Sequence, residues 1–153
     1  MSLPKPYYED SAVQIYHADC KDILPFGHGA DDAVDLILTS PPYDSLRTYG
    51  GHSWAFSTIA DCLLKVLGAG SMLVWVVGDE TTQGSESGNS FRQALYFLEH
   101  GLNLHDTMIY MKDSISFPET NRYSQVFEYM FVFVKGRPKT FNCLRDRKNK
   151  WGG

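Results

Sequence analysis

The sequence is poor in cysteine, and the three cysteines that it has stand far apart. Cys20, Cys62 and Cys143 are odd in number and show no close metal-ligand spacing. We therefore predict reduced thiols, because a disulfide framework or a zinc site needs paired or clustered cysteines. The five histidines show no metal-ligand spacing either, so the sequence predicts no metal ion.

Long apolar runs are also missing. No apolar stretch approaches the length of a membrane span, and the segment Met1 to Asp10 has neither the basic start nor the apolar core of a signal peptide. The chain of 153 residues, with 43% hydrophobic and 21% charged residues, can bury one core. These features predict a single soluble globular domain in the cytoplasm.

A basic net charge is the third absence. The formal net charge is −4, which is wrong for a simple nucleic-acid binder. The basic residues are unevenly placed, however. Seven of them lie between Lys135 and Lys150, and the only acidic residue in that segment is Asp146. By itself such a run is typical of a solvated tail. Its members are Lys135, Arg137, Lys139, Arg145, Arg147, Lys148 and Lys150.

The most informative feature that is present is the segment Thr39 to Tyr43, which follows the apolar run Val34 to Leu38. Two consecutive prolines fix φ and remove two backbone donors where the predicted strand ends. Ligands bind at the carboxyl ends of strands in parallel α/β sheets, so Ser40 Oγ, the Ser40 and Pro41 carbonyls and the Tyr43 ring are predicted to line a crevice. This set can accept hydrogen bonds from an amino group while it stacks on a flat ring. The simple alternative is a strand that ends in a diproline turn.

Residues Ser40-Pro41-Pro42-Tyr43 resemble motif IV of the amino-methyltransferases, in the form typical of the DNA-modifying members. Upstream stand Val13 to Cys20 and Asp22 to Pro25, an order that resembles the β-class of DNA amino-methyltransferases. Downstream, three segments resemble the usual continuation, motifs V and VI, and motif VII: Leu46 to Gly50, Leu63 to Val77, and Met108 to Lys112. The resemblance covers roughly residues 12 to 136.

This resemblance implies methyl transfer from S-adenosylmethionine to the exocyclic amino nitrogen of a base flipped out of double-stranded DNA. The base would stack on Tyr43, while Ser40 Oγ and the Pro41 carbonyl would accept hydrogen bonds from its amino protons. Pro42 would hold this clamp rigid. Methylation of an amino nitrogen needs no covalent intermediate, so we interpret Cys20 as a packing residue near the cofactor.

The resemblance also implies a cofactor site and a target. Asp19 matches the acidic residue that the family places near the adenosine, and Cys20, Ser40 and Pro41 complete the predicted cofactor site; the alternative for Asp19 is a turn or helix-capping role. The family more often shows Asp-Pro-Pro-Tyr for adenine. Ser40 therefore favours N4 of cytosine over N6 of adenine as the target.

In the β-class the target-recognition region follows this point of the chain. The resemblance thus implies a catalytic methyltransferase region over residues 1–136. Residues 137–153 would form a basic segment that begins, or links to, the recognition region. The predicted DNA contacts are Arg47, Arg137, Lys139, Arg145, Arg147 and Lys148.

Hydrophobic patterning predicts five strands, at about 12–17, 34–39, 71–78, 104–112 and 127–135, and two helices between the middle ones. The first helix, 56–67, would end at a left-handed cap, Gly68; its inward residues would be Phe56, Ile59, Leu63, Val66 and Leu67. The second, 90–100, would begin at the N-cap Ser90; its inward residues would be Phe91, Ala94, Leu95 and Leu98. Segment 79–89, polar and glycine-rich, is predicted to be a mobile loop over the site, with an inert surface loop as the alternative.

Strands that alternate with helices predict an α/β fold with a mostly parallel sheet covered on both faces. The last two strands are expected to pair antiparallel, because the link 114–125 contains Pro118 and no helical periodicity. Together with the resemblance, this implies the Rossmann-like fold of S-adenosylmethionine-dependent methyltransferases, with an antiparallel closing strand.

The glycine-rich Phe-x-Gly-x-Gly turn with which the family binds the methionine part of the cofactor is missing. In the β-class it lies beyond the recognition region, so the fold is predicted to be incomplete. Unpaired strands would expose edges, and we expect either a longer natural chain, a homodimer that fills the gap, or a rearranged sheet. Two other functions stay open: an RNA or protein amino-methyltransferase, and a truncated or inactive half that binds DNA or packs against a subunit.

Overall fold

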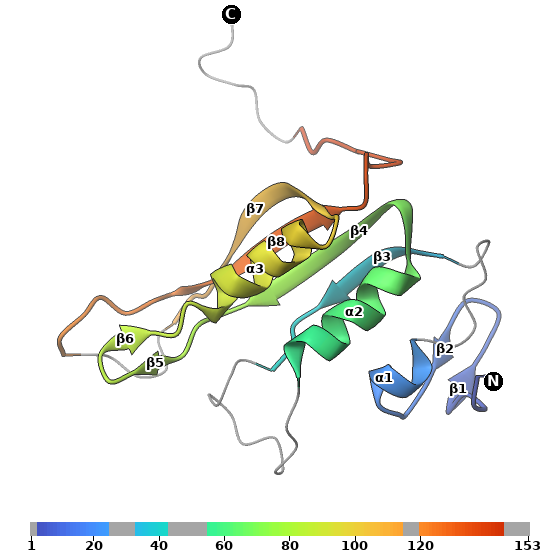
Figure 1. Ribbon diagram of the computed structural model, residues 1–153, viewed down its shortest axis with the longest axis horizontal. Helices are drawn as coiled ribbons and strands as arrows, with labels where there is room; N and C mark the ends of the chain where they lie inside the picture. Colours follow the sequence, from blue (N-terminus) through green and yellow to red (C-terminus); the bar gives the residue numbers. More distant parts are fainter. Residues whose placement is uncertain (1–2, 25–32, 43–54, 115–119, 146–153) are drawn as a thin grey trace, which may run out of the picture.

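The computed structural model describes residues 3–24, 33–42, 55–114 and 120–145. Four strands form the central sheet of these residues, in the spatial order β3-β4-β8-β7 (Figure 1). β3 and β4 pair in parallel, whereas β8 pairs antiparallel with both β4 and β7. The strands are β3 (Val34–Thr39), β4 (Leu67–Val77), β7 (Asn103–Met111) and β8 (Phe127–Val134).

The predicted antiparallel pairing of the last two strands is confirmed. β3, β4 and β7 run in one direction, and β8 is inserted between β4 and β7 in the opposite direction. The fold class is therefore confirmed as α/β with a mixed sheet, although the antiparallel strand lies inside the sheet and not at its edge.

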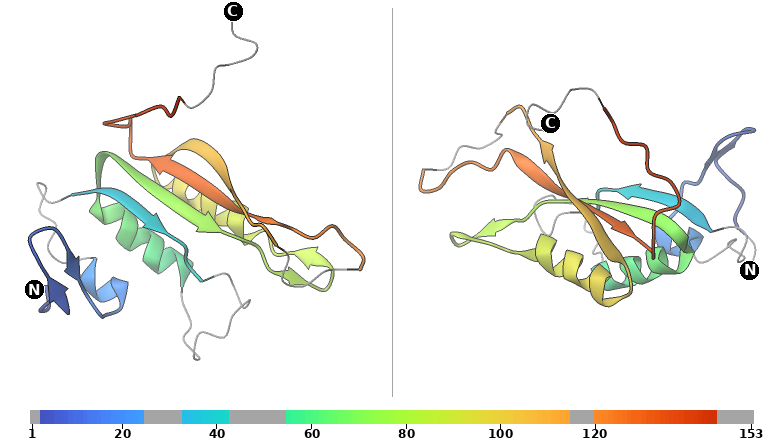
Figure 2. Two further views of the ribbon diagram at one scale, coloured as in Figure 1. Left: turned by 180° about the vertical axis from the view of Figure 1, so that it is seen from behind. Right: turned by 90° about the horizontal axis from the view of Figure 1, so that it is seen from above.

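Both long helices of the described residues, α2 (Phe56–Val66) and α3 (Asn89–Glu99), cover the same face of the sheet (Figure 2). The expectation of helices on both faces was wrong for these residues. The steps from β3 to β4 and from β4 to β7 move in the same direction across the sheet, and right-handed crossovers then place both helices on one side. On the other face, Leu36 and Leu38 of β3 remain 57% and 68% exposed.

Helix α2 buries Ala60, Leu63 and Val66 against the sheet, close to the predicted face. Its carboxyl end is satisfied by Lys135, whose Nζ donates to the carbonyls of Leu64 and Leu67 at 3.2 and 2.8 Å. The predicted left-handed cap at Gly68 was wrong, because β4 begins directly at Leu67. Gly68 is required for space instead, since a Cβ there would lie 2.7 Å from the Cβ of Ala33.

Helix α3 begins differently from the prediction. Its N-cap is Gly88, in the left-handed region at φ 66°, where a residue without a Cβ has no steric penalty. Ser90 lies inside the helix, and its N–H donates to Asp79 Oδ1 at 2.9 Å. Asp79 therefore supplies from outside the helix the acceptor that Ser90 was expected to provide.

The inward face of α3 is also rotated from the predicted one. Of the four predicted inward residues only Ala94 is buried, whereas Phe91, Leu95 and Leu98 are exposed. The buried positions of the helix are Ser90, Gln93, Ala94 and Phe97. Hydrophobicity alone gave the wrong phase because one core position is a glutamine.

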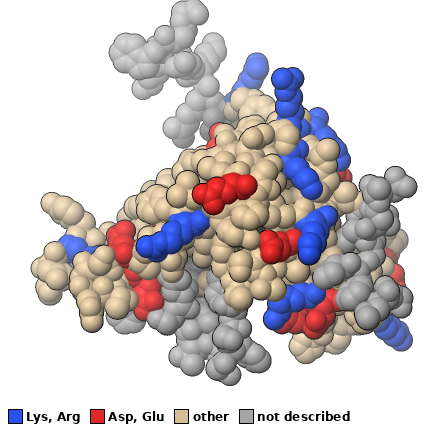
Figure 3. All heavy atoms as spheres, in the orientation of Figure 1, with Lys and Arg blue, Asp and Glu red and all other residues tan. Residues whose placement is uncertain are grey.

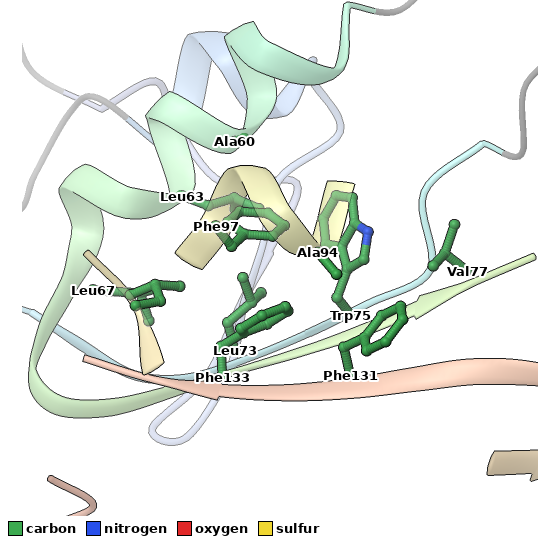
Figure 4. Close-up of a cluster of buried hydrophobic side chains, with 11 residues drawn as sticks. Ala60, Leu63, Leu67, Leu73, Trp75, Val77, Ala94, Phe97, Phe131 and Phe133 are labelled. Atoms are coloured by element: carbon green, nitrogen blue, oxygen red, sulfur yellow. The ribbon is translucent and has the colours of Figure 1, made fainter. Parts of the chain in front are cut away.

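The hydrophobic core lies between the two helices and the sheet (Figure 4). Trp75, Phe97 and Phe133 are its largest fully buried side chains. The ring centroids of Trp75 and Phe97 lie 5.2 Å apart, and those of Phe97 and Phe133 also lie 5.2 Å apart. Phe97 thereby ties α3 to two strands of the sheet.

The amino-terminal part lies outside this sheet. The predicted strand 12–17 is reduced to β2 (Gln14–Ile15), which forms a hairpin with β1 (Tyr8–Glu9), and α1 (Cys20–Ile23) follows. Within the described residues, β3 has a partner on only one side. Residues 12–17 therefore do not pair with β3.

Segment 79–89 contains a second short hairpin, formed by β5 (Thr81–Thr82) and β6 (Ser85–Glu86). The side chain of Arg122 donates to Thr81 Oγ1 and to the Gly84 carbonyl, at 3.2 and 2.5 Å. The predicted loop is therefore a structured hairpin with a link to the segment before β8. No helix of the described residues is long and apolar enough to span a membrane.

Candidate functional site

A pocket of about 590 Å³ opens at the carboxyl end of β3, a volume within the range of about 300–1,000 Å³ that small-molecule sites occupy. It lies between β3, α1 and α2, with one residue of β4 on its wall. Its lining consists of Asp19, Cys20, Lys21, Leu24, Ile37, Thr39, Ser40, Pro41, Pro42, Ala55, Ile59, Leu63 and Trp75.

Strand β3 delivers Ser40, Pro41 and Pro42 to the pocket mouth. The strand ends at Thr39, which is the register partner of Trp75 in the parallel strand β4. Pro41 is buried, while Ser40 is exposed, so the diproline segment anchors a polar side chain at the edge of the cavity. The sequence prediction that the segment after β3 lines a crevice at this strand end is confirmed for residues 40–42.

Asp19 reaches the same pocket from the start of α1. Its side chain caps this short helix by accepting the Lys21 N–H at 3.0 Å, and it forms an ion pair with Lys21 Nζ at 3.3 Å. The Lys21 N–H holds the pKa of Asp19 below its ordinary value, so Asp19 is a carboxylate at neutral pH. Asp19 therefore caps α1 and lines the pocket at the same time, so the two predicted roles do not exclude each other.

Cys20 also lines the pocket. Desolvation raises the pKa of the Cys20 thiol, and the neighbouring Asp19 carboxylate raises it further. A thiol with a raised pKa is mostly protonated at neutral pH and is a poor nucleophile. This chemistry is consistent with a non-nucleophilic Cys20, but the residue is exposed, so its packing near the cofactor stays a prediction.

Alkylation of Cys20 should report this electrostatic environment. In a Cys62→Ala, Cys143→Ala variant, we expect the pH profile for reaction with iodoacetamide to have its midpoint above the pKa of an ordinary cysteine thiol, because only the thiolate reacts. Asp19→Asn should move the midpoint down, since it removes a negative charge beside the sulfur. A wild-type midpoint below the ordinary value would contradict this assignment and indicate an activated thiol.

The remaining walls of the pocket are mainly apolar. Leu24, Ile37, Ile59 and Leu63 surround the cavity with hydrocarbon, and Trp75, whose side chain is fully buried, lies behind this wall. Walls of this kind suit a flat heteroaromatic group, with the polar atoms of Asp19 and Ser40 at the rim to orient it. The pocket thus combines an apolar body with a few convergent acceptors.

Trp75 was not predicted as a site residue, although one signal was available. It stands near the carboxyl end of a predicted strand, where ligand-binding residues gather. Ile59 and Leu63 gave no such signal, because an inward position on a helix indicates only packing.

The described part of the basic segment lies at the other end of β3. Lys139 Nζ pairs with Asp35 Oδ1 at 2.7 Å, and Asp35 stands at the start of the strand that ends beside Ser40. Arg137 and Arg145 are exposed. The structure therefore does not bring these residues together with the pocket, and their contact with DNA stays a prediction.

Charge on the helix-covered face is mixed. Figure 3 shows acidic and basic side chains interspersed there, without a continuous basic surface. The predicted site residues Tyr43, Arg47, Arg147 and Lys148 lie outside the described residues. Within the described ranges, no group of three or more His, Cys, Asp and Glu side chains could hold a metal ion.

Comparison with known proteins gives concordant matches. The family model described as DNA methylase matches residues 34–151. The chain is 64% identical over 121 residues to the orphan methyltransferase M.BamHII of Bacillus amyloliquefaciens, a match that covers 79% of this chain and 46% of M.BamHII. The chain therefore spans about half the length of this curated relative.

Two solved structures share the fold. The cytosine-N4-specific PvuII DNA methyltransferase matches 88% of this chain and 54% of its own, with a TM-score of 0.72 and 22% identity. The M1.HpyAVI–SAM complex matches 89% of this chain and 62% of its own, with a TM-score of 0.65 and 24% identity. At these identities the two structures support the predicted methyltransferase fold.

Proposed function

The chain belongs to the DNA methylase family, and we propose that it carries the amino-group clamp and part of the cofactor pocket of an enzyme that methylates an exocyclic amino nitrogen in double-stranded DNA. One observation carries the proposal. Asp19, from the start of α1, and Ser40 to Pro42, from the end of β3, line a single pocket although about twenty residues separate them in the chain.

The clamp is proposed to activate the target nitrogen, which is a poor nucleophile because its lone pair is delocalised into the base ring. Ser40 and Pro41 line the pocket, and Ser40 Oγ and the Pro41 carbonyl are the proposed acceptors. Hydrogen bonds from the amino protons to these acceptors would draw the nitrogen toward tetrahedral geometry and localise its lone pair. Pro42 restricts the backbone, so that the acceptors keep a fixed orientation. Tyr43 is proposed as the platform on which the base stacks.

The cofactor proposed for the pocket is S-adenosylmethionine, which supplies a methyl group on a positively charged sulfur. The described residues fit its adenosine part, because the apolar walls can hold the adenine ring and the Asp19 carboxylate can accept hydrogen bonds from the ribose hydroxyls. Cys20, Ser40 and Pro41 complete this wall. The sequence contains no Phe-x-Gly-x-Gly turn, so the methionine part is proposed to be held by a complementary segment, such as the part of M.BamHII that the match leaves uncovered.

Titration with S-adenosylhomocysteine tests the cofactor site. We expect binding by calorimetry that Asp19→Asn weakens about 10- to 100-fold, because the amide loses the charge-assisted hydrogen bonds to the ribose. Asp19→Asn keeps an oxygen that can accept the Lys21 N–H, whereas Asp19→Ala removes the cap of α1 as well. Asp22→Asn is the matched control, since Asp22 lies on the same helix but outside the pocket lining.

An affinity for S-adenosylhomocysteine that Asp19→Asn leaves unchanged would contradict the role of Asp19. Absence of binding by the wild-type chain would favour the other candidate, a methyltransferase half that binds DNA or packs against a subunit. The exposed apolar residues of β3 support that candidate. Adding the part of M.BamHII that the match leaves uncovered then separates the two, because a complementary half should restore binding.

We propose N4 of cytosine as the favoured target, with N6 of adenine as the alternative. The support is Ser40, which heads the clamp in place of the aspartate more often found with adenine. Both amino groups present two protons to the same pair of acceptors, so the clamp geometry serves either base.

A further inference from the structure

Gln93 is a buried polar residue that the proposed mechanism does not use. It stands on α3, is 7% exposed, and lies outside the lining of the pocket. Its Oε1 accepts a hydrogen bond from the indole Nε1 of Trp75 at 2.9 Å. Trp75 does line the pocket, so this bond joins α3 to the site.

The phase of α3 shows that the bond shapes the structure. Gln93 faces the core while Phe91 and Leu95 of the same helix are 48% and 54% exposed. A helix that maximised apolar burial would turn Leu95 inward and Gln93 outward. The observed phase keeps Gln93 beside the indole, where it satisfies a buried N–H that would otherwise lack an acceptor.

The amino end of α3 is fixed independently. Asp79 Oδ1 accepts the N–H of Ser90 at 2.9 Å, and the same carboxylate contacts the Ser90 hydroxyl. Ser87 Oγ also donates to Asp79 Oδ1, at 2.9 Å. Since Gln93 lies one turn after Ser90, these contacts set the position from which its side chain reaches Trp75.

Trp75 in turn lies beside the clamp. Its register partner is Thr39, the residue before Ser40, and its ring packs edge-on against Phe56 and Phe97 at centroid distances of 5.9 and 5.2 Å. These two rings hold the indole from both helices, and Gln93 fixes the direction of its N–H. The indole is fully buried and therefore supports, from the core side, the part of the pocket wall next to Ser40.

We propose that Gln93 is a positioning residue of this site: through the Trp75 indole it holds the pocket wall beside the clamp and so contributes to ligand affinity. The inference rests on the proposed function for the identity of the ligand. The link between Gln93 and Trp75 itself can be tested without any ligand.

The ligand-free test is near-ultraviolet circular dichroism. The contribution of Trp75 is obtained as the difference between the wild-type chain and Trp75→Phe. We expect Gln93→Met to change this indole band and Gln93→Glu, which keeps an acceptor oxygen, to preserve it. Leu102→Ala is the matched control, because Leu102 is buried in the same core but lies outside the pocket lining.

The second test is titration with S-adenosylhomocysteine. We expect Gln93→Met to weaken binding about tenfold, the loss that corresponds to one net hydrogen bond, and Gln93→Glu to bind within about threefold of wild type. In a Trp75→Phe background the Gln93→Met change should cost no further affinity, because the indole N–H is already gone. Leu102→Ala should leave the affinity of the folded chain unchanged.

The outcomes of these tests distinguish the positioning role of Gln93 from the proposed cofactor site. An indole band that Gln93→Met leaves unaltered overturns the positioning role, whether or not the ligand binds. Equal loss of affinity in Gln93→Met with and without the Trp75 indole overturns it as well, since Gln93 would then act by another route. A wild-type chain that shows the expected band changes but does not bind S-adenosylhomocysteine overturns the proposed cofactor site and the ligand-affinity role of Gln93 that rests on it.

Discussion

Replacement of Ser40 by alanine is expected to lower kcat for methyl transfer about 10²- to 10³-fold, the loss typical of removing one preorganised hydrogen-bonding group from a transition state. Ser40 Oγ is at the pocket rim beside the buried Pro41. Ser40 is proposed to stabilise the target nitrogen as it becomes tetrahedral in the transition state, so its replacement should lower kcat. Affinity for S-adenosylhomocysteine should fall less than about tenfold, because only one wall contact changes.

The measurement is transfer of a labelled methyl group from S-adenosylmethionine to duplex DNA, by this chain alone and with the uncovered part of M.BamHII added. Ser85→Ala is the matched control, because Ser85 lies in the β5-β6 hairpin and not in the pocket lining. Chromatography of the hydrolysed DNA identifies the methylated nucleoside, and N4-methylcytosine is the expected product. Full kcat in Ser40→Ala would remove Ser40 from the mechanism.

The sequence predicted the clamp end of β3 because two strong local signals coincide there. Apolar residues set the strand at 34–39, and Pro41 and Pro42 must end it; the structure places β3 at the same residues. Both signals depend only on residues that are close together in the chain, so contacts between distant residues do not override them. The antiparallel pairing of the last two strands also followed, since the link between them contains Pro118 and no helical periodicity, whereas the position of β8 inside the sheet did not.

The predictions that were wrong depend on contacts between distant residues. The N-cap of α3 is assisted by Asp79, eleven residues before Ser90, and no local pattern indicates that this carboxylate reaches back to the helix. The phase of α3 places Gln93 against Trp75, eighteen residues away, and buries Phe97 on the same face. A hydrophobicity pattern treats glutamine as an outward residue, so it must miss a buried amide that pairs with an indole.

The short amino-terminal strand was overestimated for a related reason. Residues 12–17 alternate in hydrophobicity as a strand does, yet only Gln14 and Ile15 form one, and their partner is the local hairpin strand β1. Propensity for a strand is realised only where a neighbouring strand offers its backbone. In the described residues the free side of β3 is not occupied by this segment.

Replacement of Phe97 by alanine should be the most damaging core change in α3. Phe97 is fully buried, and its ring contacts Trp75, Phe56 and Phe133 at centroid distances of 5.2 to 5.6 Å. Removal of a buried phenylalanine ring costs about 3–5 kcal/mol, because apolar contacts are lost and a cavity remains. Denaturant unfolding of Phe97→Ala should show that loss as a lower midpoint.

Leu95→Ala, on the same helix, is expected to have only a small effect on the free energy of unfolding. Leu95 is largely exposed, and alanine is the better helix former, so the free energy of unfolding should change by less than about 1 kcal/mol. The hydrophobic pattern alone would place Leu95 in the core and predict the larger loss there. A larger destabilisation in Leu95→Ala than in Phe97→Ala would therefore overturn the observed phase of α3, and with it the burial of Gln93 beside Trp75.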